Sequence, residues 1–463
     1  MREPRCNNIV PSKNLWEIAI DFLGKIDKKL IDFNLKLAYI MYKVCRIEKI
    51  PYNVTSKLVF LSCFNDVGKL YELENKTDST IETYLFLKYF SPVKDYTIIL
   101  LDQNKTRISI PAIKGLVYKA CKDYTNYLLK TNNKEEALKA ILENKSEYKL
   151  IDIKALEILT KKNDLIYEFN SYHYKTIVYK YISKMIFSGK EKNKFILMLS
   201  SLFEMYSAQT LYHSKVTAII SYMLAKEMHL KNKRAKKLYI AGLCHDLGKV
   251  CIPLKILEKP DKLTDREFSI MKKHVSYTKD ILNSKMDYEI VELAYRHHEK
   301  LDGSGYPNKL SKDYLTIDQR ILEVSDIISA LIAKRSYKEA WDIDKTIEIL
   351  DDLVNNGKID KDVVETFKKN QKKILKTTDD FTNQALKTYE KINKERENLI
   401  RKKNINDAKM VQWYHFLVFK EFKYHLKYVK INKRIKKGDK KYDRCKRFKM
   451  YLLRRDRNNE RIY

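Results

Sequence analysis

Apolar residues recur along most of the chain at the three- and four-residue spacing of amphipathic helices. Segments with this pattern lie at 15–33, 35–47, 213–230, 236–250 and 317–334. Residues 376–403 keep the spacing but carry many more charges, which indicates a long exposed helix. Only residues 95–111 suggest a β-hairpin. The pattern therefore predicts an all-α protein.

The chain also contains an internal similarity, which is clearest in two short polar motifs. Residues 58–73 align with 238–253, so that NDVGK at 65–69 falls on HDLGK at 245–249. Further matches follow in the same order and pair Tyr89 with His274, Asp123 with Asp326 and, less closely, Asn34 with His213. Because three matches come in order, two copies of one helical unit are favoured over chance similarity between lysine-rich helices.

The two copies differ at the residues that could carry chemistry. The first copy has Asn or Tyr where the second has His, and it lacks a counterpart of HHEKLDGSGYP at 297–307. We therefore expect a degenerate first copy at 1–140, a helical connector at 141–195 and a metal-competent copy at 196–375. Residues 376–463 would form a helical, strongly basic C-terminal region.

Composition agrees with a helical fold and adds a strong positive charge. Gly (10) and Pro (8) are scarce among the 463 residues, as expected for a chain with few tight turns. The formal net charge is +32, and residues 401–463 alone hold 22 Lys and Arg against 6 Asp and Glu, a net +16. Such a tail can bind an acidic partner, nucleic acid or an anionic membrane surface; a solvated helical face is the alternative.

Cysteine usage and hydropathy bear on the cellular compartment. The seven cysteines are scattered and form no CxxC pair, which favours free thiols in a reducing compartment. The first residues lack the long apolar core of a signal peptide, and no apolar run approaches the roughly 20 residues of a membrane span. We expect a cytoplasmic protein.

The second copy contains a set of imidazoles and carboxylates without thiolates: His213, His245, Asp246, His274, His297, His298 and Asp326. Such ligands suit Mn, Fe, Zn or Ni and are not typical of structural zinc. An adjacent His-Asp pair can direct one ligand toward each of two metals, and two metals can clamp a phosphate. The separations fit one ligand group per helix of a bundle. His229 has no acidic or histidine neighbour, so we interpret it as a surface residue.

These motifs together carry a family resemblance. HSKV at 213–216, HDLGK at 245–249, HHEKLDGSGYP at 297–307 and RILEVSDIISAL at 320–331 closely resemble the HD-GYP domain, a subgroup of the HD phosphohydrolases. The resemblance covers about 205–370. It implies a helical domain that hydrolyses the bacterial second messenger cyclic di-GMP to pGpG, and often onward to GMP. It also implies two or three metals, frequently iron or manganese.

The resemblance further assigns a role to each matching residue. One metal would be bound by His213, His245, Asp246 and Asp326, and Asp246 would bridge to a second metal held by His274, His297 and His298. Asp246 and Lys249 would be catalytic, with Lys249 on the scissile phosphate. The remaining substrate contacts would come from Gly305, Tyr306, Arg335 and Lys338.

One position departs from the trinuclear members of the family. Those members carry Glu four residues before the first His, where this chain has Gln209. Because a neutral amide is a weak ligand for a hard cation, we expect two metal ions, iron or manganese, and leave the step from pGpG to GMP open. A non-catalytic cyclic di-GMP receptor and a hydrolase of another nucleotide are the alternative functions. We also consider a homodimer.

Overall fold

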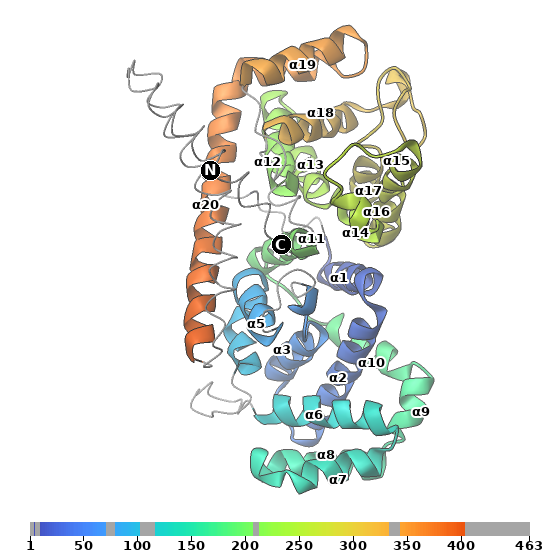
Figure 1. Ribbon diagram of the computed structural model, residues 1–463, viewed down its shortest axis with the longest axis vertical. Helices are drawn as coiled ribbons and strands as arrows, with labels where there is room; N and C mark the ends of the chain where they lie inside the picture. Colours follow the sequence, from blue (N-terminus) through green and yellow to red (C-terminus); the bar gives the residue numbers. More distant parts are fainter. Residues whose placement is uncertain are drawn as a thin grey trace, which may run out of the picture. The chain divides into compact units, whose positions relative to one another are not determined.

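The computed structural model describes residues 4, 10–70, 79–101, 116–206, 213–332 and 343–402. Within these ranges the chain forms α- and 3-10 helices without a β-strand, apart from one isolated antiparallel bridge between Asp302 and Ser311 (Figure 1). The all-α prediction is confirmed. The hairpin prediction is wrong where it can be compared, because Lys94–Leu100 is the 3-10 helix η1; residues 102–111 lie outside the described ranges.

The helices fall into three consecutive groups along the chain. The first comprises α1 (Ser12–Ile26), α2 (Lys28–Ile47), α3 (Tyr52–Cys63), α5 (Ser79–Phe90), α6 (Leu116–Thr131) and α7 (Lys134–Glu143). The second comprises η2 (Lys145–Glu147), α8 (Leu150–Lys162), α9 (Leu165–Asn170), α10 (His173–Ile182) and α11 (Gly189–Tyr206). The third comprises α12 (His213–Glu227), α13 (Asn232–Cys244), η4 (Leu247–Cys251), α14 (Leu254–Leu257), α15 (Asp265–Met271), α16 (His274–Leu282), α17 (Tyr288–Tyr295), η5 (Lys312–Tyr314), α18 (Ile317–Ile332), α19 (Ile343–Asn355) and α20 (Lys361–Lys402).

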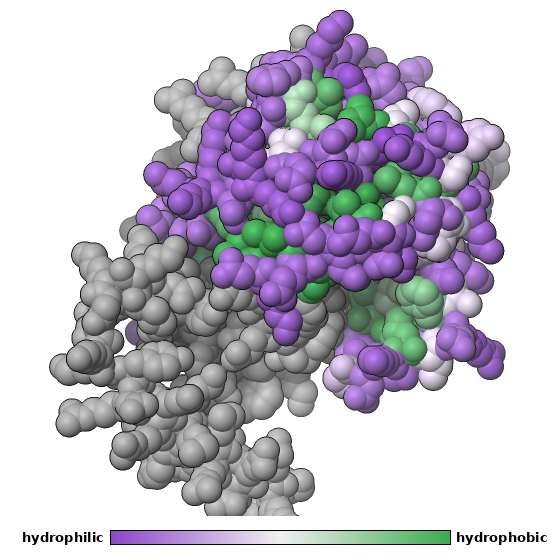
Figure 2. Space-filling view, turned by 90° about the horizontal axis from the view of Figure 1, so that it is seen from above, coloured by the Kyte–Doolittle hydropathy of each residue, from purple (hydrophilic) through white to green (hydrophobic). Residues whose placement is uncertain are grey.

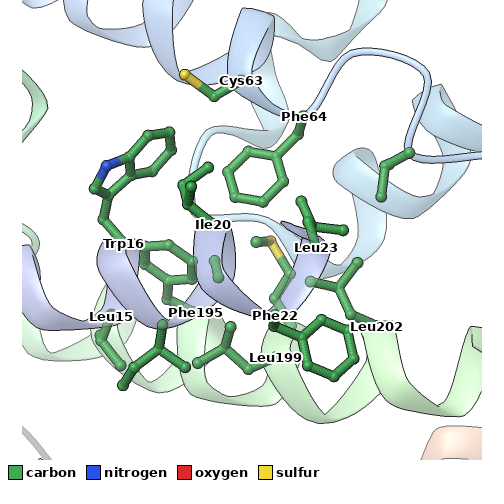
Figure 3. Packing of buried hydrophobic residues seen from close by; sticks show 14 of the residues in the cluster. Leu15, Trp16, Ile20, Phe22, Leu23, Cys63, Phe64, Phe195, Leu199 and Leu202 are labelled. Carbon is green, nitrogen blue, oxygen red and sulfur yellow. The ribbon is translucent and has the colours of Figure 1, made fainter. Parts of the chain in front are cut away.

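A core of aromatic side chains joins α1, α3 and α11 (Figure 3). The Trp16 ring lies 5.7 Å from that of Phe64, and Phe60 lies 5.6 Å from Phe195 of α11, both as edge-to-face pairs. Burial of such large rings is a major source of stability. Helix α1 also packs on η4 and α16, so the N-terminal helices are in contact with the segment that follows the HDLGK motif.

Gly248 and Gly68, which the sequence alignment pairs, pack in the same way. The Gly248 amide donates to Thr278 Oγ1 at 2.8 Å, and the Gly68 amide donates to Thr83 Oγ1 at 2.8 Å. A Cβ atom at Gly248 would lie 2.3 Å from the Thr278 nitrogen, and one at Gly68 would lie 2.6 Å from the Thr83 nitrogen. Only glycine fits either close approach. The turn after α3 therefore packs on α5 as η4 packs on α16.

This packing corrects one of the pairings taken from the sequence. A Cβ atom at Gly248 would meet the His274 carbonyl oxygen, whereas one at Gly68 would meet that of Ser79. Ser79 is thus the counterpart of His274, and the pairing of Tyr89 is wrong by ten residues. The Asp123 carboxylate pairs with Lys119 and accepts a hydrogen bond from the Tyr148 hydroxyl.

The long helix α20 packs on both α12 and α5, two helices that lie far apart in the sequence (Figure 1). Arg396 makes a two-pronged ion pair with the buried Glu82, at 2.6 Å from Nε to Oε1 and 2.8 Å from Nη2 to Oε2. Glu395 accepts hydrogen bonds from Lys88 and Tyr89. The expected domain boundary at 375 lies inside this helix.

On the face shown in Figure 2, the coloured residues are mostly hydrophilic, with hydrophobic side chains exposed in bands between them. None of the helices described here combines the length and the apolar character that crossing a bilayer requires.

Candidate metal centre

Helix ends bring the seven candidate ligands of the sequence together. His213 is the first residue of α12, His245 and Asp246 follow α13, His274 is the first residue of α16, His297 and His298 follow α17, and Asp326 lies within α18. Six of the seven thus occupy a terminus or the residues just beyond it, where the chain changes direction.

The two carboxylates occupy the middle of the cluster. Asp246 Oδ2 lies 3.3 Å from His245 Nε2, while Oδ1 of the same carboxylate lies 3.4 Å from His274 Nε2. Asp326 Oδ1 lies 2.9 Å from His213 Nε2 and 3.3 Å from His245 Nε2. One oxygen of Asp246 therefore faces each side of the cluster, as a bridging carboxylate requires.

The orientation of four of the histidines is fixed by the contacts of ring nitrogen Nδ1. The Nδ1–H groups of His245, His274 and His297 donate to the carbonyl oxygens three residues earlier in the chain, at 2.7–2.8 Å. His213 Nδ1 lies 2.9 Å from the hydroxyl of Ser329. Such hydrogen bonds select the tautomer whose Nε2 is free to coordinate a metal.

Burial and charge shift the pKa values of these groups in opposite directions. Burial raises the pKa of Asp246, but the positive charges of His245 and Lys249 outweigh it and hold that pKa well below its usual value. Burial lowers the pKa of His245, and the neighbouring carboxylates reverse this and raise it to about 10. Burial also lowers the pKa of His274 to about 4. Positive charge beside the two buried carboxylates therefore stabilises their ionised form.

The donor atoms fit metal ions of the kind expected from the sequence. His245 Nε2, Asp246 Oδ1 and Asp326 Oδ1 are buried and have no hydrogen-bond partner in the described protein. Unpaired buried polar atoms are costly, and three in one cluster indicate a missing partner with positive charge. Three overlapping groups have ligand atoms within 4.8 Å of one another: His274, His297 and His298; His213, His245 and Asp246; and His245, His297 and Asp326.

Lys249 lies at the edge of this cluster and is only partly exposed. Its Nζ is 2.6 Å from Asp246 Oδ2, so here the ammonium group contacts a carboxylate. The 3-10 helix η4 holds this geometry. Asp246 is its N-cap and Lys249 follows three positions later, so the two side chains lie on the same side of one turn. A phosphate bound at the cluster would meet the same ammonium group.

The GYP turn is held against the cluster by a buried carboxylate that the sequence interpretation overlooked. Glu299 accepts the amide hydrogens of Asn308 at 2.6 Å and Leu310 at 2.9 Å. The Tyr306 amide donates to the His298 carbonyl, and its ring centroid lies 4.8 Å from that of His298. Gly305 has no room for a side chain, since a Cβ atom would lie 2.4 Å from the Lys300 nitrogen.

The remaining predicted residues have different outcomes. Gln209, Arg335 and Lys338 lie outside the described ranges. His229 is exposed just after α12, which agrees with its assignment as a surface residue. Ser329, which contacts His213, was also overlooked, although it lies three residues after Asp326 and hence on the same side of α18. Glu299 adjoins the His pair, a signal that could have identified it.

Comparison with known proteins agrees with this geometry. The family described as "HD domain" matches residues 197–363. The chain is 38% identical over 168 residues to 3'3'-cGAMP-specific phosphodiesterase 2 of Vibrio cholerae. This match covers 36% of this chain and 32% of that protein. It is 35% identical over 134 residues to the cyclic di-GMP phosphodiesterase response regulator RpfG of Xanthomonas campestris, covering 28% and 35% of the two chains.

Among solved structures, a cyclic GMP-AMP-specific phosphodiesterase of V. cholerae, V-cGAP3, has a similar fold. The TM-score is 0.50 at 14% identity, over 78% of this chain and 98% of that chain. The two curated relatives above share only about a third of their length with this chain. Residues 197–363 thus match the HD domain family, and part of the chain is similar in sequence to proteins named as cyclic-dinucleotide phosphodiesterases.

Proposed function

We propose that this protein is a metal-dependent phosphodiesterase that hydrolyses cyclic di-GMP to pGpG and so lowers second-messenger levels. The observation that carries the proposal is the convergence of five histidines and two aspartates beside the GYP turn. A receptor that only bound the nucleotide would not need this ligand set. The names of the relatives support a cyclic dinucleotide as the substrate class.

Two metal ions, with iron or manganese as the expected identity, would be held by this cluster. His213, His245, Asp246 and Asp326 would hold one ion, and His274, His297 and His298 would hold the other, with Asp246 shared; His213 Nε2 lies 3.7 Å from Asp246 Oδ2 and His274 Nε2 lies 3.4 Å from Oδ1. When bound, the metals would activate water and neutralise charge on the phosphate. Gln209, with its neutral amide, argues against a third ion.

The protein's own groups would position the substrate and stabilise charge. Lys249 would leave Asp246 in part and donate to a phosphoryl oxygen, where negative charge accumulates during displacement. Tyr306 would lie against a guanine or the adjoining sugar-phosphate backbone. Arg335 and Lys338 would add positive charge for the dianionic substrate.

A product assay with metal analysis tests this function. Protein loaded with Mn²⁺ or Fe²⁺ should convert cyclic di-GMP to pGpG, with about two metal ions per chain. Asp246→Ala should abolish turnover and lower the metal content, because both halves of the cluster share this carboxylate. Asp313→Ala, on the exposed surface of the same domain, is the matched control. Full activity of Asp246→Ala would refute the assignment, and binding without turnover would favour a receptor.

A second candidate substrate is 3'3'-cGAMP, favoured by the name of the V. cholerae relative. The two substrates differ in one base only, and the chemistry at phosphorus is the same. Competition between the two nucleotides in one reaction, followed by chromatography of the products, gives the ratio of their kcat/KM values. If kcat/KM for 3'3'-cGAMP exceeds that for cyclic di-GMP by more than about tenfold, 3'3'-cGAMP is the preferred substrate.

We also propose that the N-terminal helices are a degenerate copy of the HD domain that binds no metal. The matched packing of Gly68 and Gly248 supports the duplication. In the first copy Lys122 Nζ lies 3.1 Å from Asp66 Oδ1, and Lys69 Nζ lies 3.2 Å from Oδ2. Two ammonium groups thus neutralise the carboxylate that corresponds to Asp246. A metal content lowered by one ion per chain in an Asp66→Asn variant would contradict this proposal.

A further inference from the structure

A series of rings leads from the metal centre to the protein surface. The Tyr306 ring lies beside that of His298, at 4.8 Å between centroids, and next to it lies Phe268, at 6.3 Å and an interplanar angle of 84°. Phe268 belongs to α15, six residues before His274. The short helix that precedes one metal ligand therefore also places an aromatic ring against the GYP turn.

Phe268 is not explained by packing within its own helix. Its side chain is 44% exposed, whereas Ile270 and Met271 of α15 pack against the small apolar cluster formed by Ile252, Ile256 and Leu257. Those two residues anchor the helix. An exposed phenylalanine beside a cluster of potential metal ligands is a surface on which a flat apolar group can stack.

A positive charge lies over the same rings. Lys272 Nζ is 4.7 Å from the centroid of Phe268 and 5.8 Å from that of Tyr306. Both distances are within the range of cation–π attraction, which holds the ammonium group beside the ring faces. Aromatic faces next to cationic groups are the combination that proteins use to bind single-stranded nucleic acids, since the bases stack and the phosphates are attracted.

We propose that Phe268 is the stacking platform for one purine base of the substrate, and that Lys272 attracts the phosphate attached to the same nucleoside. This inference rests on the proposed function and adds the residues that recognise the base. Stacking reads no hydrogen-bonding edge, so the platform accepts guanine and adenine alike. Discrimination between the two bases must come from other groups.

Binding to the manganese-loaded protein tests the platform without turnover. Isothermal titration with GMP and with inorganic phosphate separates the contribution of the nucleoside from that of the phosphate. Phe268→Ala should weaken GMP about tenfold and leave phosphate binding unchanged, since stacking contributes ~1–3 kcal/mol per base. Phe268→Tyr should retain GMP binding. Tyr288→Ala is the matched control, because Tyr288 is 71% exposed at the end of α17 remote from His297.

Lys272→Gln has a different expected signature. It should weaken both GMP and inorganic phosphate several-fold and should reduce the dependence of GMP binding on salt, because a charge contact is screened by ions. Unchanged binding of both ligands in this variant would remove Lys272 from the proposal.

Turnover provides the second readout. For a cyclic dinucleotide, Phe268→Ala should raise KM more than it lowers kcat, while Tyr288→Ala should leave both at the wild-type values. Equal losses for GMP and phosphate, or no loss for either, would overturn the platform. If the wild type hydrolyses no cyclic dinucleotide, the proposed function fails, and the GMP titration still decides the role of Phe268.

Discussion

At the scale of single residues, the centre depends on groups that never touch a metal. The seven candidate ligands could be predicted from the sequence, because His and Asp residues in short motifs can be recognised directly. The sequence did not reveal which ring nitrogen each His would present, because the acceptors are backbone carbonyls and the hydroxyl of Ser329. The role of Glu299 was hidden for a similar reason: its partners are backbone amides of Asn308 and Leu310.

Glu299 gives the first prediction at this scale. Glu299→Gln keeps the size of the side chain but leaves only one oxygen for the two amides that the carboxylate now binds. We expect the GYP turn to loosen, so that kcat/KM for the cyclic dinucleotide falls about tenfold while metal content is unchanged. Kinetics and elemental analysis on the same preparation measure both. A parallel loss of metal would mean that Glu299 supports the ligands rather than the turn.

Glu323 gives a pH-dependent prediction. Burial raises its pKa to about 7 although Lys300 Nζ lies 2.8 Å away. Because the folded pKa lies above the unfolded value, the protonated form stabilises the fold at low pH, and this contribution is lost as pH rises through 7. Glu323→Gln should therefore gain stability relative to wild type between pH 5 and pH 8, by up to about 3 kcal/mol. Urea unfolding at both pH values tests this; a pH-independent difference would contradict it.

At the scale of elements, helical periodicity was sufficient to predict the secondary structure but not the register between the copies. The pairing of Tyr89 with His274 is wrong because the segment around Tyr89 resembles the one around His274 in its Lys and Tyr residues. The structural match to His274 is Ser79, ten residues earlier in the chain. Gly68 and Gly248, which the sequence alignment pairs, do show the same close backbone approach, which only glycine tolerates. The η1 helix was mistaken for a strand because β-branched residues and Tyr also favour strands.

Helix α20 offers a test at the same scale. Removing Arg396 would leave the buried carboxylate of Glu82 without its partner, which typically costs 3–5 kcal/mol. Arg396→Ala should accordingly lower the free energy of unfolding by about that amount and free the C-terminal part of α20. Arg401→Ala is the control, since its side chain is 79% exposed and its nearest carboxylate oxygen is 3.9 Å away. Equal midpoints in urea for the two variants would show that the ion pair does not hold the helix.

At the scale of the whole molecule, charge and chemistry are separated along the chain. Most of the net +16 of residues 401–463 lies beyond the last described helix, which ends at Lys402, and the chain divides into two units after Lys403. The candidate ligands and the residues that orient them all lie between 213 and 329. No step of the proposed chemistry therefore uses the basic tail, which leaves it free to serve an acidic partner, nucleic acid or a membrane surface.

Deletion of 404–463 tests that separation. Because α20 ends at Lys402 and its ion pair with Glu82 is retained, the shortened protein should keep its metal content and its turnover of cyclic di-GMP. It should elute from a heparin column at a lower salt concentration than the full chain, since polyanion binding scales with the number of cationic contacts. A collapse of turnover with intact metal content would place the tail at the substrate. A loss of both would make it part of the fold, and the separation of charge from chemistry would then be wrong.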